Sequence, residues 1–389
     1  MKFKYPAILI IFFLLIQCKP TSRKVEDKSI RQTVNFGSLV KKKTSEVISD
    51  YSFIHLETTI ESFIGGIGQI EIFKDKIIIL DDQSNNILVF TINGKFIHKF
   101  TNRGNGPGEF IQPFSFYIDQ KGSLLLYDMQ LNRLLKYDLN SLKFIEEIKM
   151  PVNYSKSFSF LPDDDLYLYY GNKESKNYKD ETILIVSDKK GVIHKKFLKA
   201  TPSETMFHGS PTNFYSLSGN TYFYPQFSNK IYLVTKDSIK CKYELFFGNA
   251  DIVEQDLFMK NKGTIDIFRE IITTSKNWIR LIYIYENINY LIVKYYIKKD
   301  FYIGIYNKAH NSVVNFKQSD VLDDIGIGGK LPLPIGIYGN QFIAQINNFE
   351  TNKTKLKNKK LKESIDTLKE DSNPILMLYS IKNNLGNKQ

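Results

Sequence analysis

Short runs of apolar and β-branched residues alternate with turn residues along most of this chain. Each run is about five or six residues long, which suits a strand that crosses one small sheet. Turn residues such as Asp75-Lys76, Asn93-Gly94 and Lys121-Gly122 separate the runs. Asn-Gly is the strongest of these signals, because both central positions of a type I′ hairpin turn require a positive φ. The pattern therefore predicts many short antiparallel strands.

The stretch Ile70–Ile148 contains the same unit twice. Asp81 aligns with Asp128 and Phe90 aligns with Tyr137, and both pairs are 47 residues apart. Each copy comprises four of the short runs. A four-stranded unit that repeats at about 40 to 50 residues is typical of a β-propeller blade. We therefore predict an all-β fold, a propeller built from four-stranded antiparallel blades.

The rest of the chain supplies four further blades, which makes six, with five and seven as the alternatives. The third spans residues 157–198, the fourth contains residues 222–232, and the fifth and sixth span residues 279–316 and 333–381. The strand Tyr51–Leu56 has no blade of its own, and we expect it to complete the sixth blade and close the ring. Insertions are expected at residues 172–180, 251–275 and 351–371, and the last two have helical spacing of apolar residues.

The first residues have the features of an export signal. Lys2 and Lys4 precede an apolar stretch, residues 6–16, that is too short to span a bilayer as a helix. The sequence Leu15-Ile16-Gln17-Cys18 resembles the lipobox of bacterial lipoproteins, in which the cysteine is lipidated, although Gln17 replaces the usual small residue. An ordinary secretory signal is the alternative. We therefore divide the chain into a signal peptide (1–17), a lipid-anchored tether (18–50) and the propeller (51–389).

The formal net charge of +12 bears on possible partners. In a cytosolic protein such an excess would suggest nucleic acid. An exported chain meets little nucleic acid, and the excess consists of scattered lysines, so we expect no nucleic-acid partner. Solvated lysines are the simplest interpretation, and attraction to acidic glycans or anionic lipid is the alternative.

The loop between the first two blades carries a specific resemblance. Its sequence Gly104-Asn105-Gly106-Pro107-Gly108-Glu109-Phe110 resembles the inter-blade loop of NHL-type propellers. Residues 56–110 resemble a family of exported six-bladed β-propeller lipoproteins of Gram-negative bacteria, and residues 371–379 resemble the closing strand of that family. The resemblance implies the fold and a place in the cell envelope. The tether lacks the acidic cluster of some surface-exported relatives, so a protein facing the periplasm is expected.

One end of the ring is the best candidate for binding. Strands alternate in direction within a blade, so the loop between the second and third strands emerges at the same end as the connection to the next blade. Loops that a rigid scaffold positions commonly carry function. We call this end the candidate face, and its candidate ligand-contacting residues are Asp82, Gln83, Asn85, Arg103, Asn105, Glu109, Gln130, Asn132, Gln226 and Asn229.

A structural role is the competing interpretation for several residues in these loops. Gly104, Gly106 and Gly108 would serve backbone geometry. Asp81 and Asp128 would accept hydrogen bonds from neighbouring backbone amides.

The sequence assigns no catalytic residue. The five histidines are scattered without an HxH or HExxH pair, so no metal site and no cofactor are expected. The Gly-rich stretches near Gly65 and Gly104 lack the spacing and the following helix of a dinucleotide fingerprint. A GxSxG elbow is absent as well. Groups from separate blades could still converge on the axis.

Three functions remain open. The leading hypothesis is a monomeric, non-catalytic, lipid-anchored scaffold that binds a protein or a glycan through the candidate face. The rival is an enzyme with lactonase-like or lyase-like hydrolytic chemistry at an axial metal, which rests on fold analogy alone. The third is a subunit of an envelope complex that docks through the insertions at residues 251–275 and 351–371.

Overall fold

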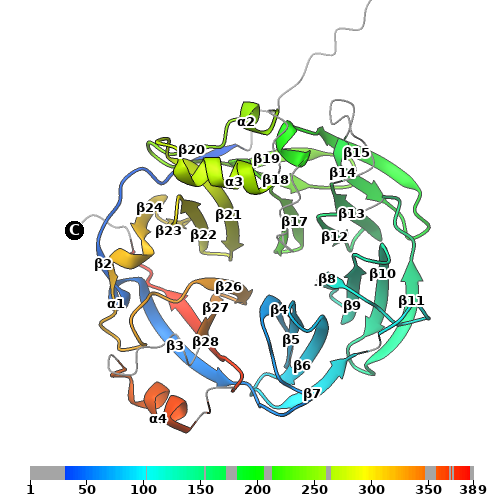
Figure 1. The fold of residues 1–389 in the computed structure, drawn as a ribbon, viewed down its shortest axis with the longest axis horizontal. Helices are drawn as coiled ribbons and strands as arrows, with labels where there is room; N and C mark the ends of the chain where they lie inside the picture. Colours follow the sequence, from blue (N-terminus) through cyan, green and yellow to red (C-terminus); the bar gives the residue numbers. More distant parts are fainter. Residues whose placement is uncertain are drawn as a thin grey trace, which may run out of the picture.

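The computed structural model describes residues 31–385 except 102, 153–154, 172–181, 206–212, 260–263, 347–355, 368 and 370–371. Six β-sheets form a ring around a central axis (Figure 1). Neighbouring inner strands contact one another all the way round, in the order β4, β8, β12, β16, β21, β26 and back to β4. The chain is therefore a six-bladed β-propeller, as the 47-residue repeat predicted.

The first three blades are four-stranded and antiparallel. Blade 1 comprises β4 (Ile67–Phe73), β5 (Lys76–Asp81), β6 (Asn86–Thr91) and β7 (Phe96–Phe100). Blade 2 comprises β8 (Pro113–Ile118), β9 (Ser123–Asp128), β10 (Arg133–Asp138) and β11 (Lys143–Ile148). Blade 3 comprises β12 (Ser157–Leu161), β13 (Leu166–Tyr170), β14 (Thr182–Ser187) and β15 (Ile193–Lys199).

Blades 4 and 5 each gain a fifth strand that runs parallel to its neighbour, which differs from the uniform four-stranded blades predicted. Blade 4 comprises β16 (Phe214–Leu217), β17 (Asn220–Phe223), β18 (Lys230–Val234) and β19 (Ile239–Phe246), with β1 (Gln32–Asn35) outside β19. Blade 5 comprises β21 (Trp278–Glu286), β22 (Tyr290–Ile297), β23 (Asp300–Asn307) and β24 (Ser312–Lys317), with β20 (Asp251–Ile252) beside β21.

Blade 6 combines strands from the two ends of the described chain. It comprises β26 (Pro334–Tyr338), β27 (Gln341–Ile346), β28 (Ile375–Ile381) and β3 (Ile48–His55), and β3 pairs antiparallel with β28. The buried side chain of Asn373 ties the same two regions together, because it accepts a hydrogen bond from Ile64 N and donates to the carbonyls of Glu57 and Ser62.

The repeat is visible in the register as well as in the sequence. A shift in pairing lies between Val89 and Phe90 in blade 1 and between Lys136 and Tyr137 in blade 2, again 47 residues apart. Both shifts occur where the third strand pairs with the fourth. Such irregularities increase the local twist of a strand pair, so the two blades share their geometry as well as their strand order.

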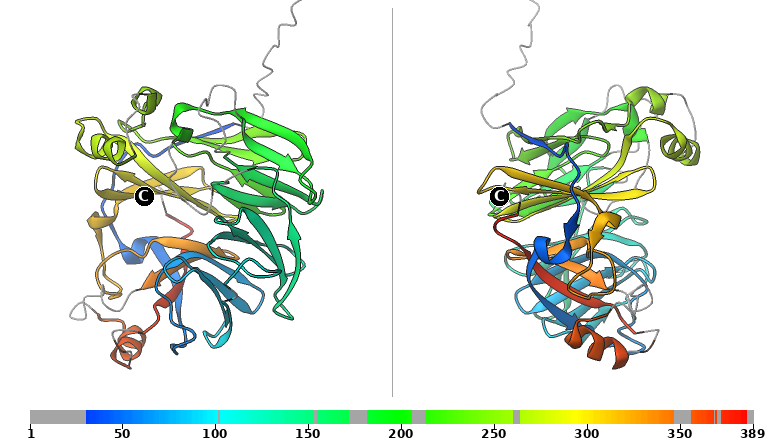
Figure 2. Two further views of the ribbon diagram at one scale, coloured as in Figure 1. Left: turned by 45° about the vertical axis from the view of Figure 1, so that its right-hand side comes forward. Right: turned by 90° about the vertical axis from the view of Figure 1, so that its left-hand side faces the viewer.

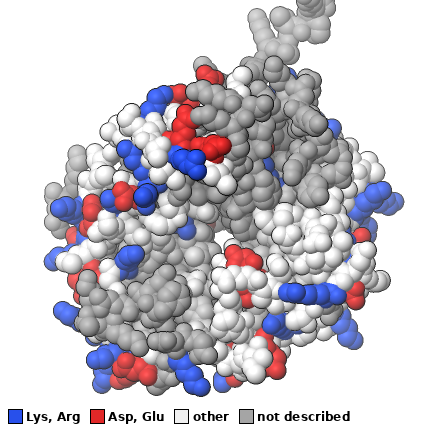
Figure 3. All heavy atoms as spheres, viewed as in Figure 1, with Lys and Arg blue, Asp and Glu red and all other residues white. Residues whose placement is uncertain are grey.

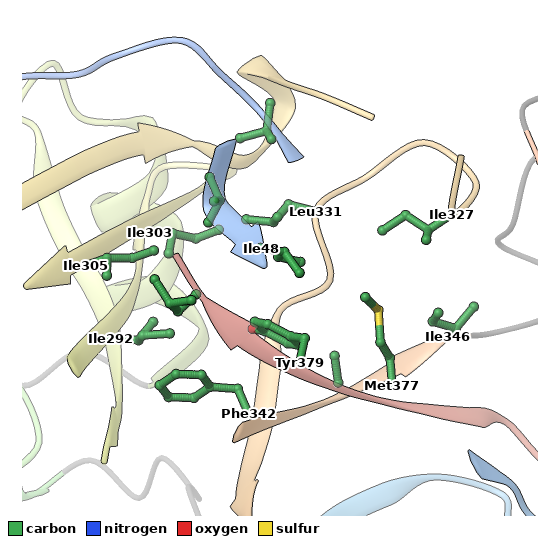
Figure 4. Packing of buried hydrophobic residues seen from close by; sticks show 14 of the residues in the cluster. Ile48, Ile292, Ile303, Ile305, Ile327, Leu331, Phe342, Ile346, Met377 and Tyr379 are labelled. Atoms are coloured by element: carbon green, nitrogen blue, oxygen red, sulfur yellow. The ribbon is translucent and has the colours of Figure 1, made fainter. Parts of the chain in front are cut away.

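Among the described residues, six hydrophobic clusters make up the core of the ring, one between each pair of neighbouring sheets. A seventh cluster lies under α2 and α3. Because a middle strand has a neighbouring sheet on both sides, its central residues are all apolar, as in Lys76–Asp81, where four consecutive apolar residues lie between the two charged ends and are buried. The cluster between blades 5 and 6 includes Ile48, Phe342, Met377 and Tyr379 (Figure 4). This packing holds the blades in a fixed arrangement around the axis.

Residues 31–47 form a strap along the outside of blades 4 to 6, which corrects part of the predicted tether (18–50). Along this strap, β1 pairs with β19, β2 (Lys42–Lys43) pairs with β25 (Val321–Leu322), and α1 (Thr44–Val47) leads directly into β3. Val34 and Phe36 are buried. The strap was missed because its pairing uses backbone groups, which leave little pattern in so short a strand. Residues 1–30 lie outside the described residues.

The insertions contain short helices. The insertion at residues 251–275 contains α2 (Gln255–Met259) and α3 (Thr264–Thr273), which stand at one end of the ring (Figure 2). The insertion at residues 351–371 contains α4 (Lys359–Thr367) beside blade 6 (Figure 2). Two 3₁₀ turns, η2 (Pro202–Thr205) and η3 (Gln318–Asp320), complete the described elements. Residues 172–180 lie outside the described residues. Within the described part, no helix combines the length and apolar character needed to cross a membrane.

Candidate functional site

The candidate face is held in shape by buried carboxylates at the ends of the second strands. Asp81, which is fully buried, accepts hydrogen bonds from the backbone amides of Gly65 and Gly66 at 2.9 and 3.0 Å. It also accepts from the amides of Gln83 and Ser84 and from the Ser84 hydroxyl. Burial alone would raise the pKa of Asp81, but these hydrogen bonds outweigh burial and lower it.

Asp128 plays the same part in blade 2. It accepts from the amides of Ile111 and Gln112 in the incoming loop and from Gln130 and Leu131 in its own turn. Each carboxylate thus joins the turn between the second and third strands to the loop that enters the blade. The structural interpretation of Asp81 and Asp128 is correct, and the residues that follow them are positioned as a result.

Gly66 and Gly68 let the Asp82 side chain lie close to the start of β4. A Cβ atom on Gly66 would lie 2.5 Å from Asp82 Oδ1, and one on Gly68 would lie 2.8 Å from Asp82 Cβ. Burial first, and then the charge of Asp81, raise the pKa of Asp82. Asp82 and Gln83 remain exposed at the innermost part of the candidate face.

Arg133, a residue that the sequence analysis did not select, organises the loop between blades 1 and 2. Its guanidinium donates to Glu109 O at 2.8 Å, to Asn105 O at 3.4 Å and to Glu147 Oε2 at 2.9 Å. The Glu109 side chain accepts from Gly106 N at 2.8 Å. Glu109 is therefore turned toward its own loop, whereas Asn105 is exposed.

The predicted face residues fall into two groups. In the first, Arg103 donates to Ser84 O at 2.6 Å, which joins the inter-blade loop to the turn after Asp81. Asn132 donates to Val152 O. Blades 1 and 2 thus bring eight residues together along one sector of the face: Asp82, Gln83, Asn85, Arg103, Asn105, Glu109, Gln130 and Asn132.

The other two residues, Gln226 and Asn229, belong to a different environment in blade 4. The Asn229 side chain donates to Leu245 O at 3.0 Å, and the backbone N–H of Gln226 donates to the hydroxyl of Tyr170 at 2.9 Å. These contacts serve the packing of blades 3 and 4.

Gln226 borders a buried ion pair that the sequence did not reveal. Lys156 Nζ lies 2.6 Å from Glu204 Oε2, and both side chains are less than one tenth exposed. Tyr170 donates to both Glu204 oxygens, and burial, followed by the charge of Glu204, holds the pKa of Tyr170 well above its usual range. Lys156 and Glu204 are 48 residues apart on different loops, so no local pattern could have paired them.

Charge on the face drawn in Figure 3 is dispersed. Lysine and arginine side chains lie mainly around the rim, and acidic side chains lie among them. This distribution agrees with the interpretation of the net charge as scattered, solvated lysines. Among the described residues, no three or more His, Cys, Asp or Glu side chains are grouped so that they could hold a metal ion.

Comparison with known proteins supplies the family. Residues 28–380 match the model of a domain of unknown function, DUF4934. The chain belongs to this family. The match covers the whole strap and the ring up to the last residue but one of β28, so the DUF4934 domain and the propeller are the same unit. Among curated proteins, none matches this DUF4934 chain in sequence.

Two solved structures share the fold. One is a Bacteroides fragilis protein named as an exported protein, with a TM-score of 0.78 and 23% identity over 90% of this chain and 99% of that chain. The other is a member of the DUF4221 family from Bacteroides vulgatus, with a TM-score of 0.54 and 12% identity over 88% of this chain and 100% of that chain. At these identities the similarity of the DUF4934 chain to both concerns the fold.

Proposed function

We propose that the protein is a monomeric, non-catalytic binding scaffold of the cell envelope, anchored by lipid on Cys18 and facing the periplasm. It recognises a protein or glycan partner through the sector of the candidate face formed by blades 1 and 2. The observation that carries the proposal is the way in which Asp81, Asp128 and Arg133 fix the loops of this sector from below. Loops fixed in advance lose little conformational entropy when they bind a partner.

Exposed polar groups on this fixed support are the proposed contacts. Asp82, Gln83, Arg103, Asn105 and Gln130 are exposed, and they include an acid, a base and three amides. Such a mixture suits hydrogen bonding to a glycan or to the polar rim of a protein interface.

The direction of the strap favours a partner on this face. β1 is parallel to β19, and β19 ends at the candidate face, so the N-terminal end of β1 points away from that face. Only residues 19–30 separate Cys18 from Arg31, which limits the span to about 45 Å even for a fully extended chain. A lipid on Cys18 would therefore hold the protein near a membrane with the candidate face turned outward.

The anchor is tested by metabolic labelling with a fatty acid in cells that produce the full chain. Wild-type protein should take up the label and partition with membranes, whereas the Cys18→Ser variant should do neither. Equal labelling of both proteins would remove the anchor from the proposal.

Partner recognition is tested by site-specific photocrosslinking in the same cells. A photoreactive amino acid at Gln130 reports on the candidate face, and the same group at Asn140 reports on the opposite end of the same blade. Both positions are exposed. We expect one discrete crosslinked band from position 130 and none from position 140, and a screen of purified protein against envelope glycans covers a carbohydrate partner.

Crosslinks of equal strength from positions 130 and 140, combined with no glycan binding, would contradict a specific candidate face. A further test is Arg103→Ala, which removes an exposed side chain of the same sector together with its hydrogen bond to Ser84 O. It should reduce the crosslink from position 130 and lower the melting temperature only slightly.

A further inference from the structure

The outer edge of blade 3 carries a dense group of lysines. The turn before β15 and β15 itself, residues 188–199, contain five lysines and a single acid, Asp188. The five are all exposed: Lys189, Lys190, Lys195, Lys196 and Lys199. In the described part of the chain, only Lys189 among them forms an ion pair, with Glu146 at 3.7 Å. Most of these positive charges are therefore unpaired.

Blade 2 adds a further lysine to this surface, and the nearest acid does not offset it. A Cβ atom on Gly191 would lie 3.6 Å from Lys149 Cγ, so the exposed Lys149 side chain lies against the turn before β15. Asp188 is directed into that turn, where it accepts hydrogen bonds from the backbone amides of Lys190 and Val192 at 2.9 Å each. The surface thus has an excess of positive charge.

Apolar side chains stand among these lysines. Val192 is 55% exposed and Ile193 is 38% exposed, and both directly follow the turn. We call this surface the blade 3 rim, and it is formed by Lys149, Lys189, Lys190, Val192, Ile193 and Lys196.

The blade 3 rim includes an open strand edge. β15 is the outermost strand of its sheet, and no described strand covers its outer edge, whereas β1 covers the outer edge of β19 (Figure 1). Lysines alone commonly protect such an edge from other strands. That role does not account for the exposed Val192 and Ile193 between them. Apolar and basic residues together are typical of a surface that contacts a membrane.

The position of the blade 3 rim fits a membrane near the proposed lipid anchor. Strand direction places the turn between β14 and β15 at the end of the ring opposite to the candidate face. The described chain begins nearby, because β1 runs parallel to β19 with Gln32 beside Tyr243, so that Arg31 lies toward the start of β19. Ile239, the first residue of β19, packs in the same cluster as Phe197 of β15. The anchor would therefore join the domain beside β15.

We propose that the blade 3 rim docks on the anionic headgroups of the membrane that holds the lipid anchor. Its lysines pair with lipid phosphates, and Val192 and Ile193 enter the interfacial region. The proposal rests on the proposed function for the location of the protein at a membrane. Each lysine near an anionic surface strengthens binding about fivefold, so a few lysines can orient a protein that lipid already holds. In this orientation the candidate face points away from the membrane.

Docking is measured by sedimentation with vesicles. The protein is the unlipidated mature chain, residues 19–389, which includes every residue that the structure describes. Vesicles of phosphatidylethanolamine and phosphatidylglycerol are anionic, and control vesicles of phosphatidylethanolamine and phosphatidylcholine carry no net charge. We expect binding to the anionic vesicles to be stronger by about tenfold or more, and to weaken when added salt screens the exposed charges. Because Cys18 is absent, this result does not depend on lipidation, which the fatty-acid labelling tests separately.

Two charge-matched variants locate the contact. Lys190→Glu/Lys196→Glu changes the blade 3 rim and should weaken binding to anionic vesicles by about tenfold or more. Lys74→Glu/Lys121→Glu makes the same change in charge on exposed turns of blades 1 and 2 at the same end of the ring, and should bind within about twofold of the wild type. Val192→Ser leaves the charge unchanged and should weaken binding a few-fold. Thermal melting shows that each variant is folded.

The proposal is overturned if the wild-type chain shows no preference for anionic vesicles. It is also overturned if the two charge-matched variants lose binding equally, or if Lys190→Glu/Lys196→Glu binds as the wild type does. A photoreactive amino acid at position 190, in cells that produce the full chain, distinguishes a membrane from a protein partner. Crosslinks to lipid support the proposal, whereas a discrete crosslinked protein without vesicle binding would assign the blade 3 rim to an acidic protein and overturn it.

Discussion

Glu286 and Lys308 form an ion pair of 2.6 Å in the interface between blades 4 and 5, with the Glu286 side chain 1% exposed. The same carboxylate accepts hydrogen bonds from Tyr215 OH at 2.5 Å and from Tyr243 OH at 2.8 Å. Both tyrosines belong to blade 4, whereas the ion pair belongs to blade 5. One carboxylate thus joins two neighbouring sheets, and burial, followed by the charge of Glu286, raises the pKa of both tyrosines.

Glu286→Ala should lower the free energy of unfolding by about 3–5 kcal/mol. It leaves the partly buried ammonium group of Lys308 without a counter-charge, although its hydrogen bond to Asn287 O remains, and it removes the acceptor of two tyrosine hydroxyls. Urea unfolding measures the loss. The control is Asp300→Ala, which breaks the exposed pair with Lys317 and should cost about 1 kcal/mol or less. Equal effects of the two substitutions would show that the buried network does not stabilise the interface.

Phe36→Ala tests whether the strap belongs to the folded domain. The Phe36 ring is fully buried, stacks on Phe247 with centroids 5.7 Å apart, and occupies the space beside Gly304. Asn315 also donates to Phe36 O at 2.6 Å. Removing such a ring typically costs about 3–5 kcal/mol, and urea unfolding should show a loss of that size.

Two further variants of the strap region sharpen this test. Leu39→Ala changes an exposed side chain of the same strap and should alter stability by about 0.5 kcal/mol or less. Gly304→Ala should destabilise, since the new Cβ atom would lie 2.3 Å from the Phe36 ring. If Phe36→Ala behaved as Leu39→Ala does, the strap would be an accessory to the ring.

The sequence predicted the fold well where each strand carries its own local pattern. The 47-residue repeat was recognisable because Asp81 and Asp128 terminate equivalent strands in the same way. The strap was not recognisable, since β1 offers only Val34 and the following Phe36 as apolar positions. Its pairing with β19 depends on backbone hydrogen bonds, which are available to almost any residue.

The candidate site was also predicted only in part, because local patterns reveal turns but not contacts between distant segments. Turn residues at one end of the ring follow from strand direction, so the sector of blades 1 and 2 could be anticipated. The burial of Glu71 that raises its pKa could not be anticipated, because an acid between two isoleucines on an inner strand has the same alternation as one that faces bulk water. Lys156 and Glu204 meet only through the packing of separate blades.

Asp81→Ala should increase local opening of the loops on the candidate face, with a smaller effect on the stability of the whole ring. The substitution leaves the amides of Gly65, Gly66, Gln83 and Ser84 without their acceptor, and hydrogen bonds to a charged group contribute about 1.5–3 kcal/mol. Hydrogen exchange should accelerate at these amides and remain slow within β5 and β6. Uniform acceleration across blade 1 would contradict a local role.

Glu71 should make stability fall as pH rises. Its pKa is raised from 4.5 to about 8, so between these values the unfolded chain has released the proton that the native state still holds. The slope contributed by this group is at most about 1.4 kcal/mol per pH unit. The nearby Tyr117 stays neutral in this window, because its pKa is about 12. Unfolding free energies from pH 5 to 9 should therefore decline more steeply for the wild type than for Glu71→Gln. Parallel curves would show that the pKa of Glu71 is not raised in the folded protein.

Lys294 should make stability rise with pH, and it should do so in a higher pH range than Glu71. Its ammonium group lies 4.6 Å from the centre of the Tyr283 ring and donates to Pro334 O at 3.4 Å, and burial lowers its pKa from 10.5 to about 8. Between these values the unfolded chain binds the proton that the native state has lost, so stability should rise with pH.

Lys294→Met keeps the length of the side chain and removes the titrating group. We expect the curve of this variant to lack the rise above pH 8, and to lie above the wild-type curve below pH 8, where the wild type must bury a charge. A variant that is less stable than the wild type at pH 7 would show that the contacts with the tyrosine ring and Pro334 outweigh the cost of burying the ammonium group.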